Sequence, residues 1–298
     1  MLKIAALIVT YNPDINLLNN LIEYLKSTDI YIEIFLVDNA SNNSKILKDK
    51  YNNESHFLFL AENVGLAEAQ NLGLEGILKS DCEAVLFFDQ DSVPNEKFIK
   101  NLIQGMDNLT CQGQRIGAVG PVFYDPRTGS KYPFIKINGV RIKKIYPSDL
   151  SPLKVSILIN SGMLVPLSTL RDVGVMRSEL FIDYVDIEWC FRAIDKKYSL
   201  YAIPSANMSH SIGDDRKLVM GREISIHSPI RRYYLARNSI YMLRLPYVPV
   251  GYKVREFIFS ILRNLLFIKT VDNKLVYIRY ILKGWKDGML KKYGKFVE

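Results

Sequence analysis

The sequence predicts an α/β fold: a mainly parallel sheet with helices on both faces, followed by a helical C-terminal region. Two observations lead to this prediction. Within residues 3–106, four short apolar runs alternate with four stretches whose apolar residues recur at helical intervals. From residue 228 onward, three longer helical stretches follow. The 298 residues, 48% apolar and 23% charged, are enough for one large or two modest domains.

The expected elements of the first part follow in order along the chain. Strands are predicted at residues 3–9, 31–38, 56–61 and 83–88. Helices are predicted at residues 14–27, 44–51, 65–80 and 95–106. Asp14 precedes the first apolar helical residues and is a favourable helix cap. This alternation is typical of strands that run parallel to one another.

The second part of the chain is less regular. Residues 124–149 are rich in turn formers and bases and indicate a flexible insertion or a hairpin. Residues 154–166 return to strand character, and residues 181–198 begin as a loop and become a helix. The C-terminal helices are predicted at residues 228–243, 250–268 and 271–286.

Polar loops follow all four strands of the first part. They are Thr10–Pro13, Asp38–Ser41, Asn63–Gly65 and Asp89–Ser92. Because ligands gather at the carboxyl ends of parallel strands, we expect these loops to form one rim around a binding site.

Two aspartates stand two residues apart in the last of these loops, in the stretch "LFFDQDS" (86–92). Asp89 and Asp91 could turn toward one point and hold a hard divalent cation, which prefers oxygen ligands. Alternatively, Asp89 ends the strand and Asp91 caps the helix expected from Asn95, since aspartate is favoured in turns and caps. The pair by itself leaves both interpretations open.

A second acidic cluster lies in "FIDYVDIEWCFR" (181–192). Asp183, Asp186 and Glu188 alternate there with bulky apolar residues, which would desolvate a carboxylate and raise its pKa into the range of a general base. The alternative is that Asp183 or Asp186 caps the following helix and Glu188 pairs with Arg192.

Two further features are compatible with a site. His210, one of three histidines, would gain a ligand role if it lay near Asp91; a single histidine is otherwise a structural residue. Small residues follow Gly65 on one flank of the expected helix, where either a phosphate or the sheet could approach closely. The glycine-rich dinucleotide fingerprint and the phosphate-loop motif are both absent from the sequence.

The net charge of +8 is unevenly distributed. Residues 216–298 carry 18 Lys+Arg against 5 Asp+Glu, a net of +13, whereas residues 1–215 have a net of −5. Nucleic acid and an anionic membrane face are the two candidate partners of the basic part. Aromatic-rich basic modules typical of nucleic-acid binding are absent, so we expect no nucleic acid.

The sequence also favours a cytoplasmic location. The three cysteines lie in or beside apolar stretches without metal-ligand spacing, which predicts a reducing compartment. We recognise no signal peptide and no apolar run long enough to span a membrane.

Seven motifs together carry a family resemblance. They are "TYNP" (10–13), "VDNAS" (37–41), "NVGLAEAQNLG" (63–73), "DQD" (89–91), "NSG" (160–162), "DIEWCFR" (186–192) and the histidine of "SHSIG" (209–213). In this order, over residues 3–215, they resemble the inverting family 2 glycosyltransferases, whose Rossmann-like nucleotide-diphospho-sugar transferase fold is called GT-A. The forms "DQDS", "FIDYVDIEWC" and "RRYYLARN" (231–238) are most similar to bacterial rhamnosyltransferases.

The resemblance implies a role for each matching residue. Nucleotide-sugar binding would fall to Thr10, Tyr11, Asn12, Asp38, Asn63, Gly65, Asn71, Asp89 and Gln90. A divalent metal, Mg²⁺ or Mn²⁺, would be held by Asp89, Asp91 and His210. The acceptor side would include Asn160, Ser161, Gly162, Glu188 and Trp189. Asp186 matches the family's catalytic base; many members have an acidic residue directly before it, where this chain has Val185, so Asp183 is an alternative base or acceptor contact.

The resemblance also implies a function. Residues 1–215 would form the nucleotide-sugar-binding and catalytic domain, and residues 216–298 a basic, helical region that contacts the acceptor, a membrane or a second subunit in a homodimer. The donor would be dTDP-L-rhamnose and the acceptor a saccharide, carried on a polyprenyl diphosphate, in bacterial surface polysaccharide synthesis. The alternatives are a family 2 transferase using UDP-galactose, UDP-glucose or UDP-N-acetylglucosamine, and a non-catalytic protein that binds a sugar nucleotide or nucleic acid.

The basic region contains an apolar stripe that suggests how it would meet a membrane. Leu275, Ile278, Leu282 and Trp285 recur on one face of the last expected helix, with bases between them. Cationic amphipathic helices bind anionic membrane faces. The alternative is that the stripe packs on the catalytic domain or forms a dimer.

Overall fold

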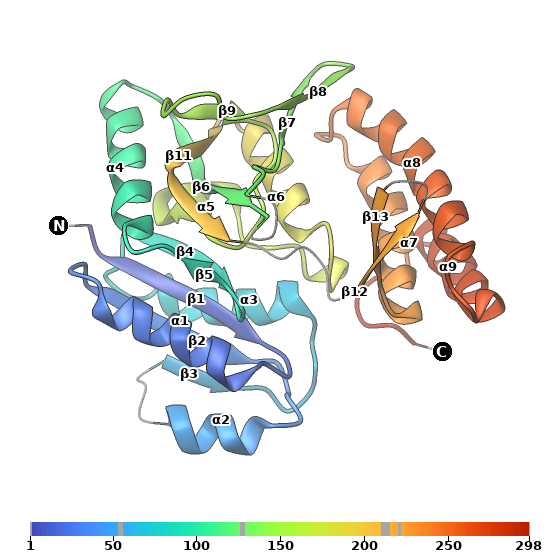
Figure 1. The fold of residues 1–298 in the computed structure, drawn as a ribbon, viewed down its shortest axis with the longest axis horizontal. Coiled ribbons are helices and arrows are strands. Elements are labelled where there is room, and N and C mark those ends of the chain that lie inside the picture. Colours follow the sequence, from blue (N-terminus) through green and yellow to red (C-terminus); the bar gives the residue numbers. More distant parts are fainter. Residues whose placement is uncertain (1, 53–55, 126–128, 210–214, 220–221, 298) are drawn as a thin grey trace.

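A computed structural model of the protein describes residues 2–52, 56–125, 129–209, 215–219 and 222–297 (Figure 1). Within these ranges, a nine-stranded sheet has the order β3-β2-β1-β4-β10-β6-β11-β5, with β9 paired to β11. The strands are β1 (Ile4–Thr10), β2 (Ile32–Asp38), β3 (His56–Phe59), β4 (Ala84–Asp89), β5 (Val93–Pro94), β6 (Ile116–Tyr124), β9 (Leu153–Val155), β10 (Leu164–Pro166) and β11 (Ser199–Ser209).

The sheet is mainly parallel, as the sequence predicts. Strand β1 pairs in parallel with β2 and β4, β2 with β3, and β6 with β11, while β10 runs antiparallel between β4 and β6. The register places Thr10 opposite Asp38 and Val9 opposite Asp89, so three of the predicted strands end at the same edge of the sheet. The polar loops therefore share one rim.

Helices cover both faces of this sheet. They are α1 (Ile15–Ser27), α2 (Ser44–Tyr51), α3 (Leu66–Ile77), α4 (Phe98–Cys111), α5 (Leu167–Val173) and α6 (Val185–Asp195), with a short 3₁₀ helix η1 (Ser178–Leu180). Alternate residues of β1 enter two separate cores: Ile4 packs with α1 and α4, whereas Ala5 packs with α3, α5 and α6. The Asp14 carboxylate caps α1 by accepting from the backbone N–H groups of Asn16 and Leu17.

Several elements were not expected from the sequence, among them β6, β11 and α5. Strand β6 contains Gly117, Gly120 and Pro121, and β11 contains Pro204, all residues that weaken a strand pattern. The two strands nevertheless pair, with a register irregularity between Ile203 and Asn207 that accommodates the proline. Helix α5 is only seven residues long, too short for a clear helical period.

The small residues of α3 serve close packing against the sheet. A Cβ atom on Gly73 would lie 2.4 Å from Leu7 Cδ1 and 3.1 Å from Val37 Cγ2, so a larger residue would push the helix away from β1 and β2. Of the two uses expected for this flank, the structure shows helix–sheet packing.

The later part of the chain adds two hairpins and three helices. The expected insertion is a hairpin of β7 (Phe134–Asn138) and β8 (Arg141–Ile145), and a second hairpin joins β12 (Asp215–Val219) and β13 (Arg222–Ile226). The helices are α7 (Pro229–Arg244), α8 (Val250–Ile268) and α9 (Lys274–Met289). Figure 1 shows them together at the end of the molecule opposite the N-terminus. None of the helices in the described ranges is both long and apolar enough to cross a membrane.

Glycines allow α9 to lie directly against α7. A Cβ atom on Gly284 would lie 2.5 Å from Tyr233 O, and one on Gly288 would lie 2.9 Å from Arg237 O. Helix α7 begins after the Ser228 cap and carries buried polar residues, so it is an internal helix. It connects the C-terminal helices to the sheet-containing part through hydrogen bonds described below.

Candidate functional site

The four rim loops are joined by hydrogen bonds, which fixes them as one surface. Thr10 Oγ1 donates to Asp38 Oδ1 at 2.9 Å, and Asn39 Nδ2 donates to Asn63 Oδ1 at 3.1 Å. Gln90 Oε1 accepts from Tyr11 N at 2.8 Å. Each bond links the end of one strand to the next, so the loops meet as predicted.

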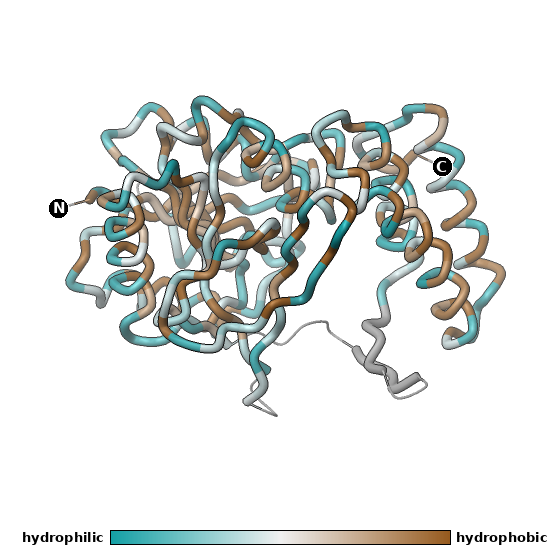
Figure 2. Tube along the Cα trace, turned by 90° about the horizontal axis from the view of Figure 1, so that it is seen from above, coloured by the Kyte–Doolittle hydropathy of each residue, from teal (hydrophilic) through white to brown (hydrophobic). Residues whose placement is uncertain are grey.

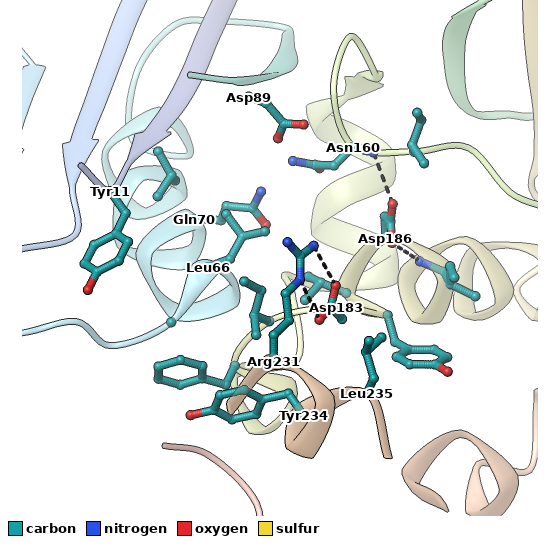
Figure 3. A pocket seen from close by; sticks show the side chains of 18 of the residues that line it. Tyr11, Leu66, Gln70, Asp89, Asn160, Asp183, Asp186, Arg231, Tyr234 and Leu235 are labelled. Carbon is teal, nitrogen blue, oxygen red and sulfur yellow. Dashed lines mark hydrogen bonds and ion pairs between the residues drawn. The ribbon is translucent and has the colours of Figure 1, made fainter. Parts of the chain in front are cut away.

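A pocket of about 1100 Å³ opens between this rim and the C-terminal helices (Figure 3). The rim contributes Thr10, Tyr11, Asn63, Gly65, Asp89, Gln90 and Asp91, all predicted from the sequence. The opposite wall contributes Asn160, Asp183 and Asp186, also predicted, together with Arg231, Tyr234, Tyr252, Arg255, Glu256 and Arg263.

Asp89 and Asp91 form a turn at the pocket. Ser92 N donates to Asp89 O at 3.1 Å, which closes the turn. Helix α4 begins only at Phe98 with Lys97 as its N-cap and no side-chain capping bond, so the alternative that Asp91 caps this helix is wrong. Burial, and then the negative charges of Asp91 and Asp186, raise the pKa of the Asp89 carboxyl to about 7.

Asp186 lies across the pocket, in the first turn of α6. Its Oδ2 accepts from Asn160 N at 3.3 Å, and its Oδ1 accepts from Ile187 N at 2.8 Å. Burial raises the pKa of its carboxyl to about 6, although these hydrogen bonds act in the opposite direction. Asp186 is therefore a carboxyl whose pKa lies close to neutral, which suits proton transfer.

Asp183 has a different environment. Arg231 NH2 lies 3.1 Å from Asp183 Oδ1, and Arg231 Nε lies 3.3 Å from Oδ2. The Asp183 carboxylate is therefore held in a salt bridge by a residue of α7. Of the two aspartates that the sequence left as alternatives, the geometry favours Asp186 as the base. Helix α6 has Tyr184 as its N-cap, with no side-chain capping bond, so neither aspartate occupies the cap position.

The loop that carries Asp183 has an unusual backbone. Phe181, Asp183 and Tyr184 have φ values of 64°, 62° and 65°, in the left-handed region that non-glycine residues rarely adopt. Two buried residues of α7 hold this loop. Asn238 Nδ2 donates to the carbonyl oxygens of Leu180, Ile182 and Asp183 at 2.9, 2.8 and 3.2 Å, and Arg237 NH2 donates to Leu180 O at 2.8 Å.

Replacing Asn238 by alanine should therefore release the loop. The change removes the side-chain donor to Ile182 O and Asp183 O, while Leu180 O keeps its bond from Arg237. Each carbonyl group left unpaired costs about 1–3 kcal/mol, so we expect a lower melting temperature and a marked loss of activity. Thermal unfolding and the transfer rate measure the two effects. Asn20→Ala, on the exposed side of α1, is the control and should change neither. Full activity in Asn238→Ala would show that the loop holds its conformation without the Asn238 hydrogen bonds.

The raised pKa of Asp186 predicts a pH-dependent cost to stability. The folded protein binds this proton more tightly than the unfolded chain, whose aspartate pKa is about 3.9, so stability falls as the pH rises from about 4 to 6. Without metal, the free energy of unfolding of Asp186→Asn relative to that of the wild type should rise by about 1 kcal/mol between pH 5 and pH 8. If the difference in stability between Asp186→Asn and the wild type did not change with pH, the pKa of Asp186 would not be raised in the folded protein.

Several predicted site residues do not line the pocket. Asp38 is buried and accepts from Thr10 and Ser41, and Asn12 accepts from Asn42 N, so both support the rim. Asn71 bonds to Met176 and Ser178, which positions the segment before α6. The buried Ser161 hydroxyl bonds to Ser92, and Gly162 packs against Phe98 and Pro121. His210 lies outside the described residues.

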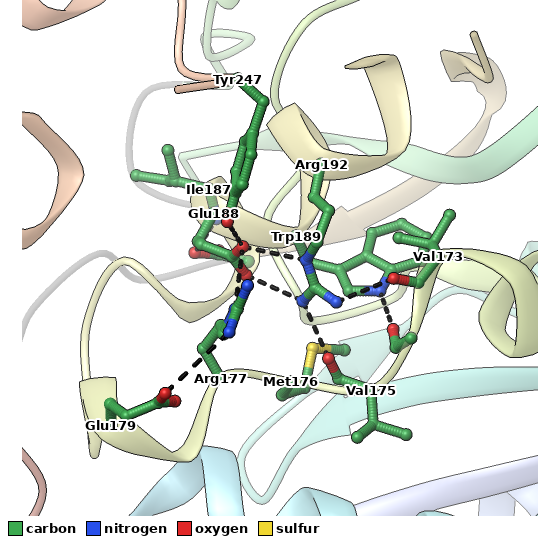
Figure 4. Close-up of polar contacts among 12 residues, drawn as sticks. Val173, Val175, Met176, Arg177, Glu179, Ile187, Glu188, Trp189, Arg192 and Tyr247 are labelled. Atoms are coloured by element: carbon green, nitrogen blue, oxygen red, sulfur yellow. Dashed lines mark hydrogen bonds and ion pairs between the residues drawn. The ribbon is translucent and has the colours of Figure 1, made fainter. Parts of the chain in front are cut away.

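The acceptor-side expectation is wrong for Glu188 and Trp189, because both side chains are 0% exposed (Figure 4). Arg192 binds both Glu188 carboxylate oxygens at 2.9 Å, and Tyr247 donates to the same carboxylate. Trp189 Nε1 donates to Gly174 O at 2.9 Å. Glu188 thus follows the alternative of an i, i+4 pair with Arg192, and the two residues anchor α6.

The sequence did not identify the residues that the C-terminal helices bring to the pocket. Arg231 and Tyr234 lie in "RRYYLARN", which was recognised only as a family-like stretch. On α8, Glu256 accepts from Tyr184 OH and from Arg263 NH2. Glu256 is the only acid of α8, whose other charged residues are all basic, and this is the signal that could have found the group.

Comparisons with known proteins agree with this geometry. The family description Glycosyl transferase family 2 matches residues 5–163, more than half of the chain. The dTDP-rhamnosyl transferase RfbF of Shigella flexneri is 40% identical over 291 residues, which cover 96% of this chain and 95% of that protein.

Solved structures show the same fold at low sequence identity. S. aureus TarS residues 1–349 align over 96% of this chain and 81% of that one, with a TM-score of 0.57 and 17% identity. The Pyrobaculum calidifontis mannosyltransferase PcManGT, in complex with GDP-Man and Mn²⁺, aligns over 97% and 86%, with a TM-score of 0.55 and 14% identity. GalNAc-T7, with UDP, GalNAc and Mn²⁺, aligns over 83% of this chain, with a TM-score of 0.58 and 13% identity, and this chain spans about half (53%) of its length.

These likenesses confirm the expected GT-A fold, with its mainly parallel sheet and helical C-terminal region. The family match and the relative of similar length confirm the expected kind of enzyme. The chain belongs to glycosyl transferase family 2 and is a glycosyltransferase.

Proposed function

We propose that this glycosyltransferase moves L-rhamnose from dTDP-β-L-rhamnose to a saccharide hydroxyl, with inversion, and that it depends on a divalent metal. One observation carries the reaction: Asp186, a buried carboxyl with a pKa raised to about 6, faces Asp89 in one pocket, while Asp183 is paired with Arg231. The choice of donor is supported by the relative of similar length, which is a dTDP-rhamnosyl transferase.

The residues of the pocket fit a divalent cation. Asp89 and Asp91 both line the pocket, and the negative charge of Asp91 helps to raise the pKa of Asp89. Asn160 Oδ1 is buried without a hydrogen bond from any described residue, and Figure 3 shows Asn160 lying between Asp89 and Asp186. Asp89 and Asp91 would hold the cation, since Mg²⁺ and Mn²⁺ prefer oxygen ligands. When bound, it would neutralise the negative charge that develops on the departing nucleoside diphosphate.

The protein's own groups account for the remaining steps. The rim residues bind the nucleotide part of the donor, with Thr10 and Tyr11 on the base and ribose side. Asp186 accepts the proton of the acceptor hydroxyl as its oxygen bonds to the anomeric carbon from the face opposite the diphosphate. The bond between that carbon and the diphosphate oxygen breaks, and its electron pair leaves with the diphosphate. One displacement inverts the configuration, so a β-linked donor yields an α-L-rhamnoside without a covalent sugar–enzyme intermediate.

A donor screen tests this proposal. We expect metal-dependent release of nucleoside diphosphate from dTDP-rhamnose, and at least tenfold less from UDP-galactose, UDP-glucose and UDP-N-acetylglucosamine. The screen is run with Mg²⁺, with Mn²⁺ and with a chelator. A preference for a UDP-hexose would keep the family and reject rhamnose, whereas release unaffected by the chelator would reject the metal. Binding of donors without turnover of any would favour a non-catalytic sugar-nucleotide-binding protein.

The proposal extends to the location and to the division of the chain. Residues 1–215 would bind the donor, and residues 216–298 would face the acceptor, because α7 and α8 contribute the pocket wall opposite the rim. An acceptor saccharide on a polyprenyl diphosphate would place the enzyme at the cytoplasmic face of a bacterial membrane, where surface polysaccharides begin. Net charge of +13 in the C-terminal part supports contact with anionic lipids rather than a role in the donor site.

A further inference from the structure

Helix α8 has an inverted distribution of side chains. Its buried stripe contains the polar residues Glu256, Ser260 and Asn264, which are 3%, 6% and 4% exposed. Ser260 Oγ donates to Ser239 Oγ on α7, and Glu256 bonds to Tyr184 and Arg263. Soluble helices normally bury their apolar face. On α8 it is the polar stripe that faces the protein.

The other side of α8 is apolar and open to solvent. Between about a third and a half of each side chain is exposed, as for Ile258 (47%), Leu262 (47%) and Leu265 (55%). We use the name outer face for a set of six residues. They are Val254, Phe257, Ile258, Ile261, Leu262 and Leu265. Figure 2 shows hydrophobic stretches along the helices at this end of the molecule. A continuous apolar surface of this kind marks a contact with a partner or a membrane.

The charges around the outer face indicate which partner covers it. Residues 256–287 carry six Lys or Arg and three acids, Glu256, Asp272 and Asp287. Arg263 and Lys283 pair with the buried Glu256 and Asp287. Lys269, Lys274 and Arg279 are all exposed. Two copies joined through this surface would bring like charges together, whereas anionic lipid headgroups would complement them. Apolar side chains with a basic surround are typical of helices that lie in a membrane interface.

The opposite side of the same helix lines the pocket. Tyr252, Arg255, Glu256 and Arg263 of α8 belong to the wall across from Asp89 and Asp91. A helix whose outer face rests in the lipid surface therefore brings the acceptor side of the pocket to that surface. The stripe on α9 noted in the sequence is only partly open to solvent: Leu275 and Leu282 are exposed, while Ile278 and Trp285 are half-buried.

We propose that the outer face of α8 inserts into the interface of an anionic membrane and so presents the pocket to an acceptor carried on a lipid. The acceptor part rests on the proposed function, whereas the lipid contact rests on the outer face alone. The two can therefore fail separately.

Vesicle sedimentation with the full-length protein tests the proposal. We expect binding to vesicles of phosphatidylglycerol and phosphatidylethanolamine, and at least tenfold weaker binding to phosphatidylcholine vesicles. The triple variant Ile258→Gln, Leu262→Gln, Leu265→Gln should lose at least tenfold in binding to the anionic vesicles. A matched triple variant at exposed apolar residues elsewhere, Tyr31→Gln, Ile46→Gln, Leu150→Gln, should bind as the wild type does.

Two further measurements complete the test. The α8 variant should keep its melting temperature and its donor turnover with a soluble saccharide, because the three side chains do not line the pocket. Analytical ultracentrifugation should show the same mass for the wild type and the α8 variant.

The proposal would be overturned in favour of a second copy if the wild type were a dimer, the α8 variant were a monomer and neither bound vesicles. Equal vesicle binding by wild type and variant would overturn it as well. If the protein bound anionic vesicles but released no nucleoside diphosphate from dTDP-rhamnose, only the proposed rhamnose function would be rejected.

Discussion

Asp186→Asn should lower the transfer rate by about 10²–10⁴-fold, the usual contribution of a general base. Asparagine has nearly the same size but cannot accept the proton of the acceptor hydroxyl. The nucleotide would still meet the rim loops on the other side of the pocket, so the affinity for the donor should be retained. Steady-state rates with saturating acceptor give the first quantity, and calorimetric titration with the donor gives the second.

The control for this change lies on the same helix. Asp195, at the C-terminal end of α6, is exposed, and Asp195→Asn should leave the rate unchanged. Because the charged form of Asp186 is the active one, the wild-type rate should fall as the pH drops below about 6, and a bound cation would move this limb lower still. An Asp186→Asn variant that kept the wild-type rate would exclude Asp186 as the base and direct attention to Asp183.

Asp91→Ala should abolish metal-dependent transfer while the fold remains intact. Asp91 is exposed at the pocket and its charge destabilises ionised Asp89, so its removal leaves no buried group without a partner. The rate with saturating Mn²⁺ should fall by at least 10²-fold, since removal of a group that neutralises transition-state charge has effects of this size. Mn²⁺ should raise the melting temperature of the wild type but not that of the variant.

Glu96→Ala provides the comparison, because Glu96 is an exposed acid five residues further along. It should preserve both the rate and the shift in melting temperature with Mn²⁺. If Asp91→Ala retained the shift and the activity, Asp89 and Asp91 would be no more than the turn that ends β4. The measurement of the melting temperature separates loss of metal binding from loss of the reaction.

The edge of the sheet illustrates how far the sequence can predict a site. Four apolar runs alternate with stretches of helical periodicity, a pattern that implies parallel strands. The carboxyl ends of parallel strands lie at the same edge of the sheet. Thr10, Asn63 and Asp89 could therefore be placed together before any coordinates, and the hydrogen bonds between the loops confirm it. Strands β6 and β11 were missed because their glycines and prolines obscure the strand pattern, while pairing within the sheet stabilises them.

The sequence did not predict the roles of individual acids in the segment around Asp186. Glu188 lies two positions after Asp186, but two positions on a helix turn the side chain to a different face, where Arg192 and Tyr247 enclose it. Asp183 and Asp186 could not be separated by pattern either. Their difference depends on Arg231, 48 residues away in sequence from Asp183, with which it forms a salt bridge.

The sequence by itself determined the order of the strands and helices of the first half, the rim loops and the aspartates at the pocket, because these follow from local periodicity and from turn chemistry. Only the tertiary structure decided which aspartate is paired, which acids are buried, and that α7 and α8 form the second wall of the pocket. It also showed that α8 exposes its apolar side. These properties depend on contacts between distant segments, whose free energy of burial and of charge pairing is not written in any local stretch of the chain.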